Sequence, residues 1–368
     1  MRVCVTGGTG FVGGHVVREL LEAGHEVRVT YRDERRLNRL GALEPEPVKA
    51  DLFDRAAMRR AVRGCDQLFH VAGFVNSRPP ERAWQVNALG PRRAVEAAAA
   101  EDVQRVVVTS SVAGLGPVAP DAIGTEEDPF RGGALGLVYP DSKHEGELEA
   151  LGTAARLGIE VVVVNPSYVL GVPVDRSQPG ETSTRMIGNY LRGRLPAVVN
   201  GRTDFCDVRD VARGHLRAAE RGEAGRRYVL GGHDGDWVGL IELVAELSGV
   251  HHPVAVLPPV LGPVAERAET LRLPTPIASE GILLMALNWS YSSRKARGEL
   301  GYRSRPLEGT VRDTVDWYRE LIDAGTLSST ITPLSLGAAG MRVAGRTGLT
   351  ALARAVGRRA GRTLVTGG

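Results

Sequence analysis

The 368-residue chain has few cysteines, and the three that it has lie far apart. Cys4, Cys65 and Cys206 show no paired spacing, which argues against a disulfide framework or a cysteine zinc site and is typical of a reducing compartment. The sequence also lacks an apolar run of membrane-spanning length, and no signal peptide precedes the first expected strand. We therefore expect a cytoplasmic protein without stable membrane insertion.

Acidic residues are absent after Asp323, where the tail carries six arginines. The net charge of +3 therefore leaves −3 for residues 1–323, a balance that does not favour nucleic-acid binding. The tail 323–368 is rich in Gly, Ala and Arg, and we expect it to be poorly ordered. Because it has no Trp or Phe, a solvated extension is favoured over a weak contact with anionic lipid.

Val-rich strands alternate with helical patterns through the first half of the chain. Strands are expected at 3–5, 27–31, 48–51, 67–72, 105–109 and 160–164, and helices at 11–22, 54–63, 81–100 and 141–157. Continuous apolar strands separated by helices predict an α/β protein with a parallel sheet that is covered on both faces.

A glycine-rich run, Thr6-Gly7-Gly8-Thr9-Gly10-Phe11-Val12-Gly13, joins the first expected strand to the first expected helix. Small residues let the backbone approach a phosphate, and the free N–H groups at the helix start attract its charge. This position predicts a pyrophosphate site in a Rossmann-type doubly wound parallel sheet.

Beyond residue 166 the alternation weakens, except for a helix and a strand within 207–230. We therefore assign 1–170 to a dinucleotide-binding domain and expect 199–231 to return to it. Segments 171–198 and 232–322 would form a smaller, partly interleaved C-terminal substrate lobe. Its last amphipathic helix is expected over 308–322.

Tyr139 and Lys143 are four residues apart and share one face of an expected helix. A nearby ammonium favours the phenolate, so this tyrosine could move protons near neutral pH. Ser110 and Ser111 follow the strand 105–109, at the edge where open α/β sheets bind ligands, and Ser111 could hold a substrate oxygen there. Each pattern alone is commonplace, but their order after the glycine run favours catalysis.

In this order and spacing, the motifs resemble those of the extended short-chain dehydrogenase/reductase family over residues 1–322. The nearest resemblance is to dihydroflavonol-reductase-like and 3β-hydroxysteroid-dehydrogenase-like members, whose later motifs are similar to 205–215 and 293–302. The resemblance implies a metal-free catalytic set and a homodimer through the two long helices. The catalytic residues would be Ser111, Tyr139, Lys143 and Asn87, with Asn87 supporting the lysine through a backbone kink. The cofactor-binding residues would be Thr6, Gly7, Gly10, Phe11, Val12, Gly13, Arg32, Asp51, Leu52, Val71, Ala72, Gly73, Ser110, Tyr139, Lys143, Pro166 and Val169.

The end of the second strand carries Tyr31 and Arg32, where NAD enzymes place a carboxylate. Arg32, followed by Arg35 and Arg36, suits a 2′-phosphate, so we predict NADP(H) rather than NAD(H). Asp33 keeps NAD(H) open, because a small shift of this loop could bring its carboxylate to the ribose.

The function expected from these residues is NADP(H)-dependent reduction of a carbonyl, or the reverse oxidation of a secondary alcohol, in a small hydrophobic molecule. The apolar stretches 256–261 and 282–287 could line its pocket or fill a core, and both interpretations stay open. Four arginines keep open a nucleotide-sugar epimerase or dehydratase with tightly bound NAD: Arg185, Arg192, Arg194 and Arg202. A non-catalytic NADP-binding sensor or scaffold is a second alternative, disfavoured because tyrosine and lysine are both present.

Overall fold

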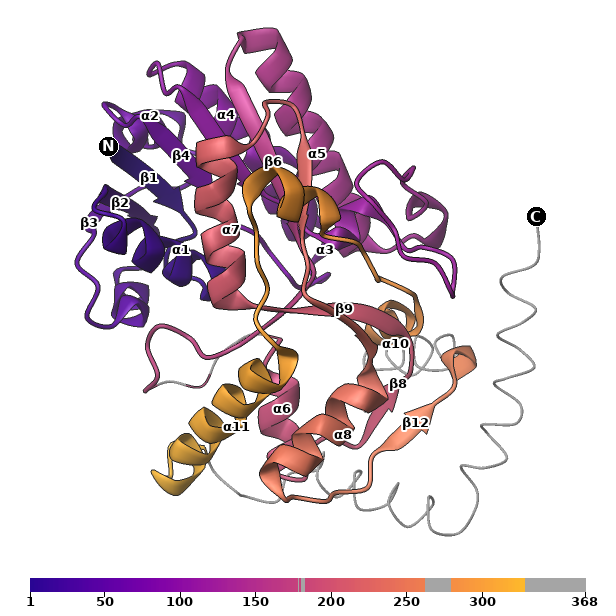
Figure 1. The fold of residues 1–368 in the computed structure, drawn as a ribbon. Helices are drawn as coiled ribbons and strands as arrows, with labels where there is room; N and C mark the ends of the chain where they lie inside the picture. Colours follow the sequence, from indigo (N-terminus) through magenta and orange to yellow (C-terminus); the bar gives the residue numbers. More distant parts are fainter. Residues whose placement is uncertain (178, 180–182, 262–278, 328–368) are drawn as a thin grey trace.

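The computed structural model describes residues 1–177, 179, 183–261 and 279–327. In this part of the chain, seven strands form a parallel sheet in the order β10-β6-β5-β4-β1-β2-β3 (Figure 1). The strands are β1 (Arg2–Thr6), β2 (Glu26–Tyr31), β3 (Glu46–Lys49), β4 (Gln67–His70), β5 (Arg105–Thr109), β6 (Glu160–Pro166) and β10 (Arg227–Leu230). The order reverses between β1 and β4, where doubly wound sheets bind their ligands.

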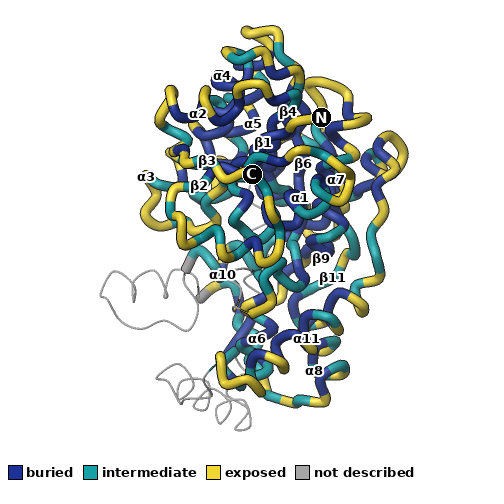
Figure 2. Tube along the Cα trace, turned by 90° about the vertical axis from the view of Figure 1, so that its left-hand side faces the viewer, coloured by how far each residue is buried: buried dark blue, intermediate teal, exposed yellow. Residues whose placement is uncertain are grey.

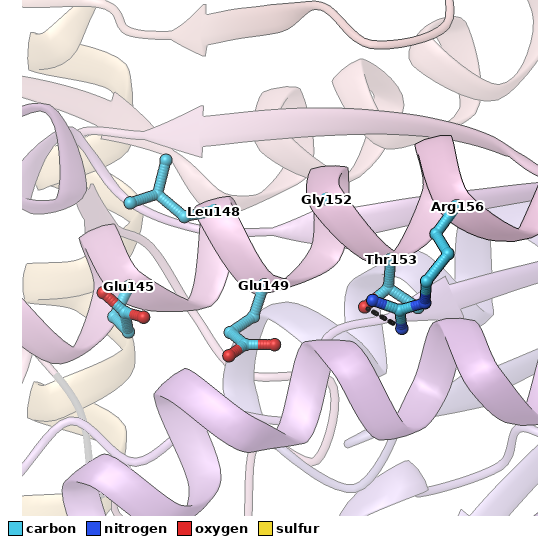
Figure 3. Close-up of a pocket in the computed structure, with 6 residues that line it drawn as sticks. All are labelled: Glu145, Leu148, Glu149, Gly152, Thr153 and Arg156. Carbon is cyan, nitrogen blue, oxygen red and sulfur yellow. Dashed lines mark hydrogen bonds between the residues drawn. The ribbon is translucent and has the colours of Figure 1, made fainter.

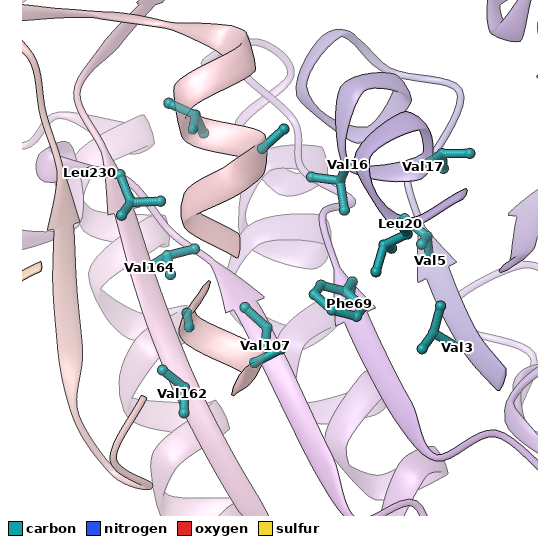
Figure 4. Close-up of a cluster of buried hydrophobic side chains, with 14 of the residues drawn as sticks. Val3, Val5, Val16, Val17, Leu20, Phe69, Val107, Val162, Val164 and Leu230 are labelled. Atoms are coloured by element: carbon teal, nitrogen blue, oxygen red, sulfur yellow. The ribbon is translucent and has the colours of Figure 1, made fainter. Parts of the chain in front are cut away.

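Helices cover both faces of this sheet. One face packs against α1 (Phe11–Glu22), α7 (Val208–Arg221) and η6 (Ala296–Leu300), and the other against α2 (Arg55–Val62), α4 (Gly90–Ala99) and α5 (Val138–Leu157). Figure 4 shows the first of these cores, where strand side chains such as Val5, Phe69 and Val107 meet Val16 and Leu20 of α1. Each fully buried side chain of this size stabilises the fold by about 1.5–3 kcal/mol before entropy is counted. The α/β, doubly wound fold predicted from the sequence is thus confirmed.

The later part of the chain forms a second body below the sheet in Figure 1. Its three-stranded sheet has the order β11-β9-β7, and a two-stranded sheet pairs β12 with β8. The elements are β7 (Tyr168–Leu170), α6 (Arg185–Leu191), β8 (Ala197–Val199), β9 (Arg202–Asp207), β11 (His233–Asp236), α8 (Trp237–Ser248), β12 (Ala255–Leu257), η5 (Pro259–Leu261), α10 (Ser279–Ala286) and α11 (Leu307–Asp323). The chain passes from β9 through α7 to β10 of the large sheet before it re-enters this body. The exact lobe boundaries stay a prediction, and residues 328–368 of the basic tail lie outside the described residues.

A buried carboxylate joins the two bodies at the end of β9. Asp207 is 2% exposed and caps α7 by accepting a 2.8 Å hydrogen bond from the backbone N–H of Arg209. It also accepts bonds from the Arg209 guanidinium, at 2.7 Å, and from the Thr310 hydroxyl of α11, at 2.8 Å. Arg209 in turn pairs with Asp313. The segment 205–215, which resembles a later family motif, therefore connects α7 to α11.

Several expected elements differ from the observed ones in their bounds. The expected helix 81–100 is divided into α3 (Pro80–Ala83), a π-helical segment η2 (Trp84–Leu89) and α4. The expected strand 67–72 ends at His70, because Val71 and Ala72 run against the glycine turn. Figure 2 shows the strands of the sheet buried and the outer helix faces exposed. Among the described residues, no helix has the length and apolar character needed to cross a bilayer.

Candidate active site

The glycine run forms a tight turn between β1 and α1. Gly7 has φ of +71°, and a Cβ built on it would lie 2.5 Å from the backbone N of Ala72. A Cβ on Gly13 would lie 2.1 Å from the Gly7 carbonyl oxygen. No side chain caps the start of α1, where Gly10 is the N-cap. The turn thus combines close backbone approach with uncapped helix N–H groups, which fits the pyrophosphate of a dinucleotide.

Two predicted residues form the floor of this turn. The Thr6 hydroxyl lies 2.8 Å from Nδ1 of His70, at the ends of β1 and β4. Burial, helped by the Lys143 ammonium, lowers the pKa of His70 to about 3. His70 is therefore neutral at physiological pH, which fits a structural residue beneath the cofactor better than a proton-transfer group.

Ser111 and Tyr139 come together at the end of β5. The Ser111 side chain caps the short helix η3 (Val112–Leu115) by accepting a 3.2 Å bond from the N–H of Ala113. Burial raises the pKa of Tyr139, and a hydrogen bond with Ser111 partly offsets that rise. The serine hydroxyl and the phenol can therefore act on one oxygen atom of a substrate.

Lys143 reaches the same strand end from the second turn of α5. Its Nζ donates a 3.1 Å hydrogen bond to the carbonyl oxygen of Thr109, the last residue of β5. The side chain is buried, and burial lowers the pKa of Lys143 to about 8 against the opposing charge of Glu147. A Cβ built on Gly73 would lie 3.3 Å from Nζ and 3.7 Å from Oδ1 of Asn87. The small residue predicted at position 73 therefore leaves the backbone close to both polar groups.

Asn87 lies in the π-helical segment η2, in agreement with the expected backbone kink. Its amide exchanges two 2.8 Å hydrogen bonds with the backbone of Phe74 and donates a 3.1 Å bond to the Ser142 hydroxyl of α5. A Cβ built on Gly146 would lie 2.0 Å from the Asn87 carbonyl oxygen, so α5 can approach η2 this closely only with glycine there. A π-bulge of this kind frequently marks a functional site.

Charged residues gather where β2 and β3 end. Arg32 lies 3.9 Å from Asp51 in an exposed ion pair. Asp33 is bound by the Arg35 guanidinium through both oxygens, at 3.0 and 2.9 Å, and this hydrogen bonding lowers the pKa of Asp33. Leu52 packs against the core between the sheet and α2 and α4. Arg32 and Asp51 are thus neighbours, as expected for residues at one end of a bound dinucleotide.

The remaining predicted cofactor residues surround the same sheet edge. Phe11 and Val12 open α1, and the Phe11 ring makes an edge contact with His15. Ser110 follows β5 and donates its N–H to Val164 at 2.8 Å. Pro166 ends β6 and Val169 lies in β7, paired with Cys206 of the second body.

Apolar side chains from the second body reach Tyr139. Leu284 and Leu287 pack in one cluster with Tyr139 and Val118, together with buried Trp289. By contrast, Val256 packs in the interior of the second body. Of the two apolar stretches, Leu284 and Leu287 of 282–287 therefore share a cluster with the tyrosine, whereas 256–261 contributes to a core.

Glu147 was missed in the sequence. It lies one turn after Lys143 on α5, is 2% exposed, and accepts a 2.5 Å hydrogen bond from the Asn165 amide. The signal was available, because the four-residue spacing that places Tyr139 beside Lys143 also places Lys143 beside Glu147. A cluster of His, Cys, Asp or Glu able to hold a metal is not found among the described residues.

Comparison with known proteins places this site in a family. The model of the NAD dependent epimerase/dehydratase family matches residues 3–231. A Synechocystis sp. protein whose name assigns it to the dihydroflavonol 4-reductases is 35% identical over 329 residues, which cover 86% of this chain and 94% of that protein.

A second relative, from Stigmatella aurantiaca, is named 4-hydroxy-2-methyl-3-oxo-4-farnesyl-3,4-dihydroquinoline-1-oxide ketoreductase. It is 30% identical over 83% of this chain and 92% of its own length. The solved structure of gox2253 superposes with a TM-score of 0.75 at 32% identity and covers 86% of this chain and 98% of its own. The chain therefore belongs to the NAD dependent epimerase/dehydratase family, within the extended short-chain dehydrogenases/reductases, and is an NAD(P)-dependent oxidoreductase.

Proposed function

We propose that this oxidoreductase uses NADP(H) to reduce the carbonyl group of a small hydrophobic molecule. The observation that carries the proposal is the convergence of Ser111, Tyr139 and Lys143 at the carboxyl end of β5. Bound there, the nicotinamide would supply the hydride, which is chemistry that protein side chains do not provide.

The side chains account for the rest of the reaction. The hydroxyl of Ser111 donates a hydrogen bond to the carbonyl oxygen, and the phenol of Tyr139 gives that oxygen its proton. The Lys143 ammonium, held by Thr109 in a buried place, favours the phenolate and so lowers the barrier to proton transfer. Asn87 positions α5 through Ser142 and lies near Lys143, where it can support a water relay that brings a proton from solvent to replace the one that Tyr139 gives up.

NADP(H) is proposed over NAD(H) on the charges at the end of β2. Asp33, the one carboxylate that could replace the missing NAD-type acid, has both oxygens engaged by Arg35. Arg32 is 52% exposed in its side chain and pairs with Asp51 only at 3.9 Å, so its guanidinium can turn to a 2′-phosphate.

A hydrophobic substrate is proposed because Leu284, Leu287 and Val118 pack against the same apolar cluster as Tyr139. One relative is named a dihydroflavonol 4-reductase, and the other is named a ketoreductase of a dihydroquinoline oxide that carries a farnesyl group. The epimerase alternative needs free cations for a diphosphate, and two of the candidate arginines are engaged within the protein. Arg202 pairs with Asp234, and Arg192 binds Gly188 and Asn189 at the end of α6. A non-catalytic sensor is the least supported alternative, since Tyr139 and Lys143 are both present.

The proposal extends to a cytoplasmic homodimer. Its location is inferred from three buried cysteines that form no disulfide. The dimer would form on α5, where a groove is lined by Glu145, Leu148, Glu149, Gly152, Thr153 and Arg156 (Figure 3). Leu148 is 53% exposed on that helix, so it offers an apolar contact at the groove.

The test is Tyr139→Phe, assayed as NADPH oxidation with a panel of aromatic and alicyclic ketones and aldehydes. The variant is expected to lose about 10²–10⁴-fold in kcat while its NADPH affinity stays near that of the wild type. Tyr190→Phe is the matched control, because that buried hydroxyl donates to Val250 in the second body. Near-normal turnover by Tyr139→Phe would refute the mechanism. Oxidised NAD that survives dialysis in the purified protein would favour the epimerase.

A further inference from the structure

A buried polar cluster lies one helical turn after Lys143 on α5, whereas Tyr139 lies one turn before it. It centres on the Glu147 carboxylate, which is 2% exposed. The Asn165 amide, fully buried in β6, donates to Oε1 of Glu147 at 2.5 Å and to the Ser111 carbonyl oxygen at 3.0 Å. The same asparagine thus holds both the carboxylate and the backbone of the serine proposed to bind substrate.

Arg227 supplies the positive charge on the other side of the cluster. Its Nη1 lies 3.6 Å from Oε2 of Glu147, and it comes from β10, at the edge of the sheet. The arginine is held in turn by the Glu126 carbonyl oxygen, and the Glu126 carboxylate accepts a 2.7 Å bond from the N–H of Val229. A buried carboxylate that has such a partner can remain ionised, whereas an isolated one would take up a proton.

The polar groups of this cluster pack closely around the backbone of Gly114. A Cβ built on Gly114 would lie 2.9 Å from Oε1 of Glu147 and 2.9 Å from the Ser110 hydroxyl. Only glycine at position 114 therefore leaves room for both groups. Burial raises the pKa of Glu147, and hydrogen bonds from the Ser110 hydroxyl and the Asn165 amide, together with the Arg227 charge, oppose that rise.

We propose that Glu147 is a positioning residue of this active site, whose ionised carboxylate, anchored by Asn165 and Arg227, keeps the Lys143 ammonium charged at the end of β5. The inference rests on the proposed function, in which a charged Lys143 favours the phenolate of Tyr139. A lysine in such a buried place favours its neutral form, and a carboxylate one helical turn away opposes that preference.

Charged or titratable groups face Glu147 from each element around it. On α5 they are Lys143 and His144, and on β10 the group is Arg227. From the second body the Tyr291 phenol approaches, and its pKa is raised above the usual range mainly by burial. Lys143 and Arg227 are the cations of this set, and Lys143 is the buried one, so loss of the carboxylate would leave the Lys143 ammonium buried without that counter-charge.

The experiment uses the fact that the chain has only three lysines, Lys49, Lys143 and Lys295. Full-length protein labelled with ¹³C at lysine Cε gives three resonances, and Lys143→Arg identifies the one to follow. In Glu147→Gln, the titration midpoint of Lys143 is expected to move to lower pH by about 1 unit or more. Glu145→Gln, which removes an exposed carboxylate from the same helix, is expected to leave that midpoint unchanged.

Two further variants separate charge from folding. Glu147→Asp keeps the charge and is expected to restore the midpoint at least in part. Glu147→Leu also removes the charge, is expected to move the Lys143 midpoint in the same direction as Glu147→Gln, and is used if Glu147→Gln does not fold. An unchanged Lys143 midpoint in folded Glu147→Gln or Glu147→Leu overturns the proposal. This readout needs neither substrate nor turnover, so it is independent of the Tyr139→Phe test.

Discussion

The carbonyl oxygen of Gly7 lies where a Cβ of residue 13 would have to stand, at a separation of only 2.1 Å. These two glycines therefore pack backbone to backbone across the turn between β1 and α1. The contact fixes the direction of the uncapped helix start, and with it the direction of the N–H groups that would meet a pyrophosphate.

Gly13→Ala is therefore expected to weaken NADPH binding by at least ~10-fold and to lower the melting temperature, because the new Cβ must push the turn open. Gly309→Ala is the matched control, a helical glycine of α11 with no atom within 4 Å of a built Cβ. That variant should bind NADPH normally and gain about 0.5–1 kcal/mol of stability. Fluorescence titration and thermal melting measure the two effects, and equal NADPH affinity in both variants would contradict the account.

Arg32→Ala is expected to reduce the preference for NADPH over NADH by about 10-fold or more, since a charge-assisted hydrogen bond to phosphate contributes about 1.5–3 kcal/mol. Affinity for NADPH should fall while affinity for NADH stays within about 2-fold. Arg60→Ala, which removes an exposed arginine from α2, controls for the change in net charge. Titration of both nucleotides measures the ratio, and an unchanged ratio in Arg32→Ala would refute the choice of cofactor.

Much of the fold could be predicted because the strands of a buried parallel sheet are continuous apolar runs. The bounds of β5 and α1 coincide with the expected 105–109 and 11–22, and β10 ends at Leu230, within the segment 207–230 where a helix and a strand were expected. The family could be predicted because the spacing of its motifs depends on where the cofactor binds rather than on how the core packs. The expected 81–100 helix was wrong in detail, because helical propensity says nothing of the tight contact between Gly146 and Asn87 that accompanies the π-bulge.

The parts of the site that escaped prediction depend on side chains from distant segments. Glu147 contacts Asn165 of β6 and Arg227 of β10, which are distant in the sequence and come together only in the folded sheet. Its role therefore could not be predicted from the sequence. The two apolar stretches of the second body could not be told apart, because pocket walls and cores have the same composition. Only the structure places Leu284 beside Tyr139 and Val256 in the interior.

Leu148→Arg tests the proposed dimer face on α5. The longer, charged side chain would replace an exposed leucine among the residues that line the groove and would have to be desolvated in a dimer, so the variant is expected to elute as a monomer. Val260→Arg, at a residue that is 40% exposed elsewhere in the chain, should keep the wild-type oligomeric state. Light scattering after size exclusion measures the mass. A wild-type dimer that persists in Leu148→Arg would move the interface away from this groove.

His215 makes the stability of the protein depend on pH in a direction that can be worked out. It is fully buried, its Nδ1 donates to the Val211 carbonyl oxygen, and its Nε2 accepts from the Thr109 hydroxyl, both at 2.8 Å. Burial lowers the pKa of His215 to about 4, against an ordinary value of 6.5. Between these values the unfolded chain binds the extra proton, so the free energy of unfolding falls as the pH falls from 6.5 towards 4.

In His215→Asn, residue 215 binds no proton between pH 6.5 and pH 4, so the free energy of unfolding does not fall for this reason in the variant. At pH 7.5 the variant should be less stable than the wild type, because it leaves the Thr109 and Val211 bonds imperfectly replaced. At pH 5 the difference should narrow by about 2 kcal/mol, the linkage expected for one histidine over 1.5 pH units. Urea unfolding at the two pH values measures it. If the gap between the two proteins were the same at both, His215 would have to titrate alike in the folded and unfolded chains, which its burial beneath β5 does not allow.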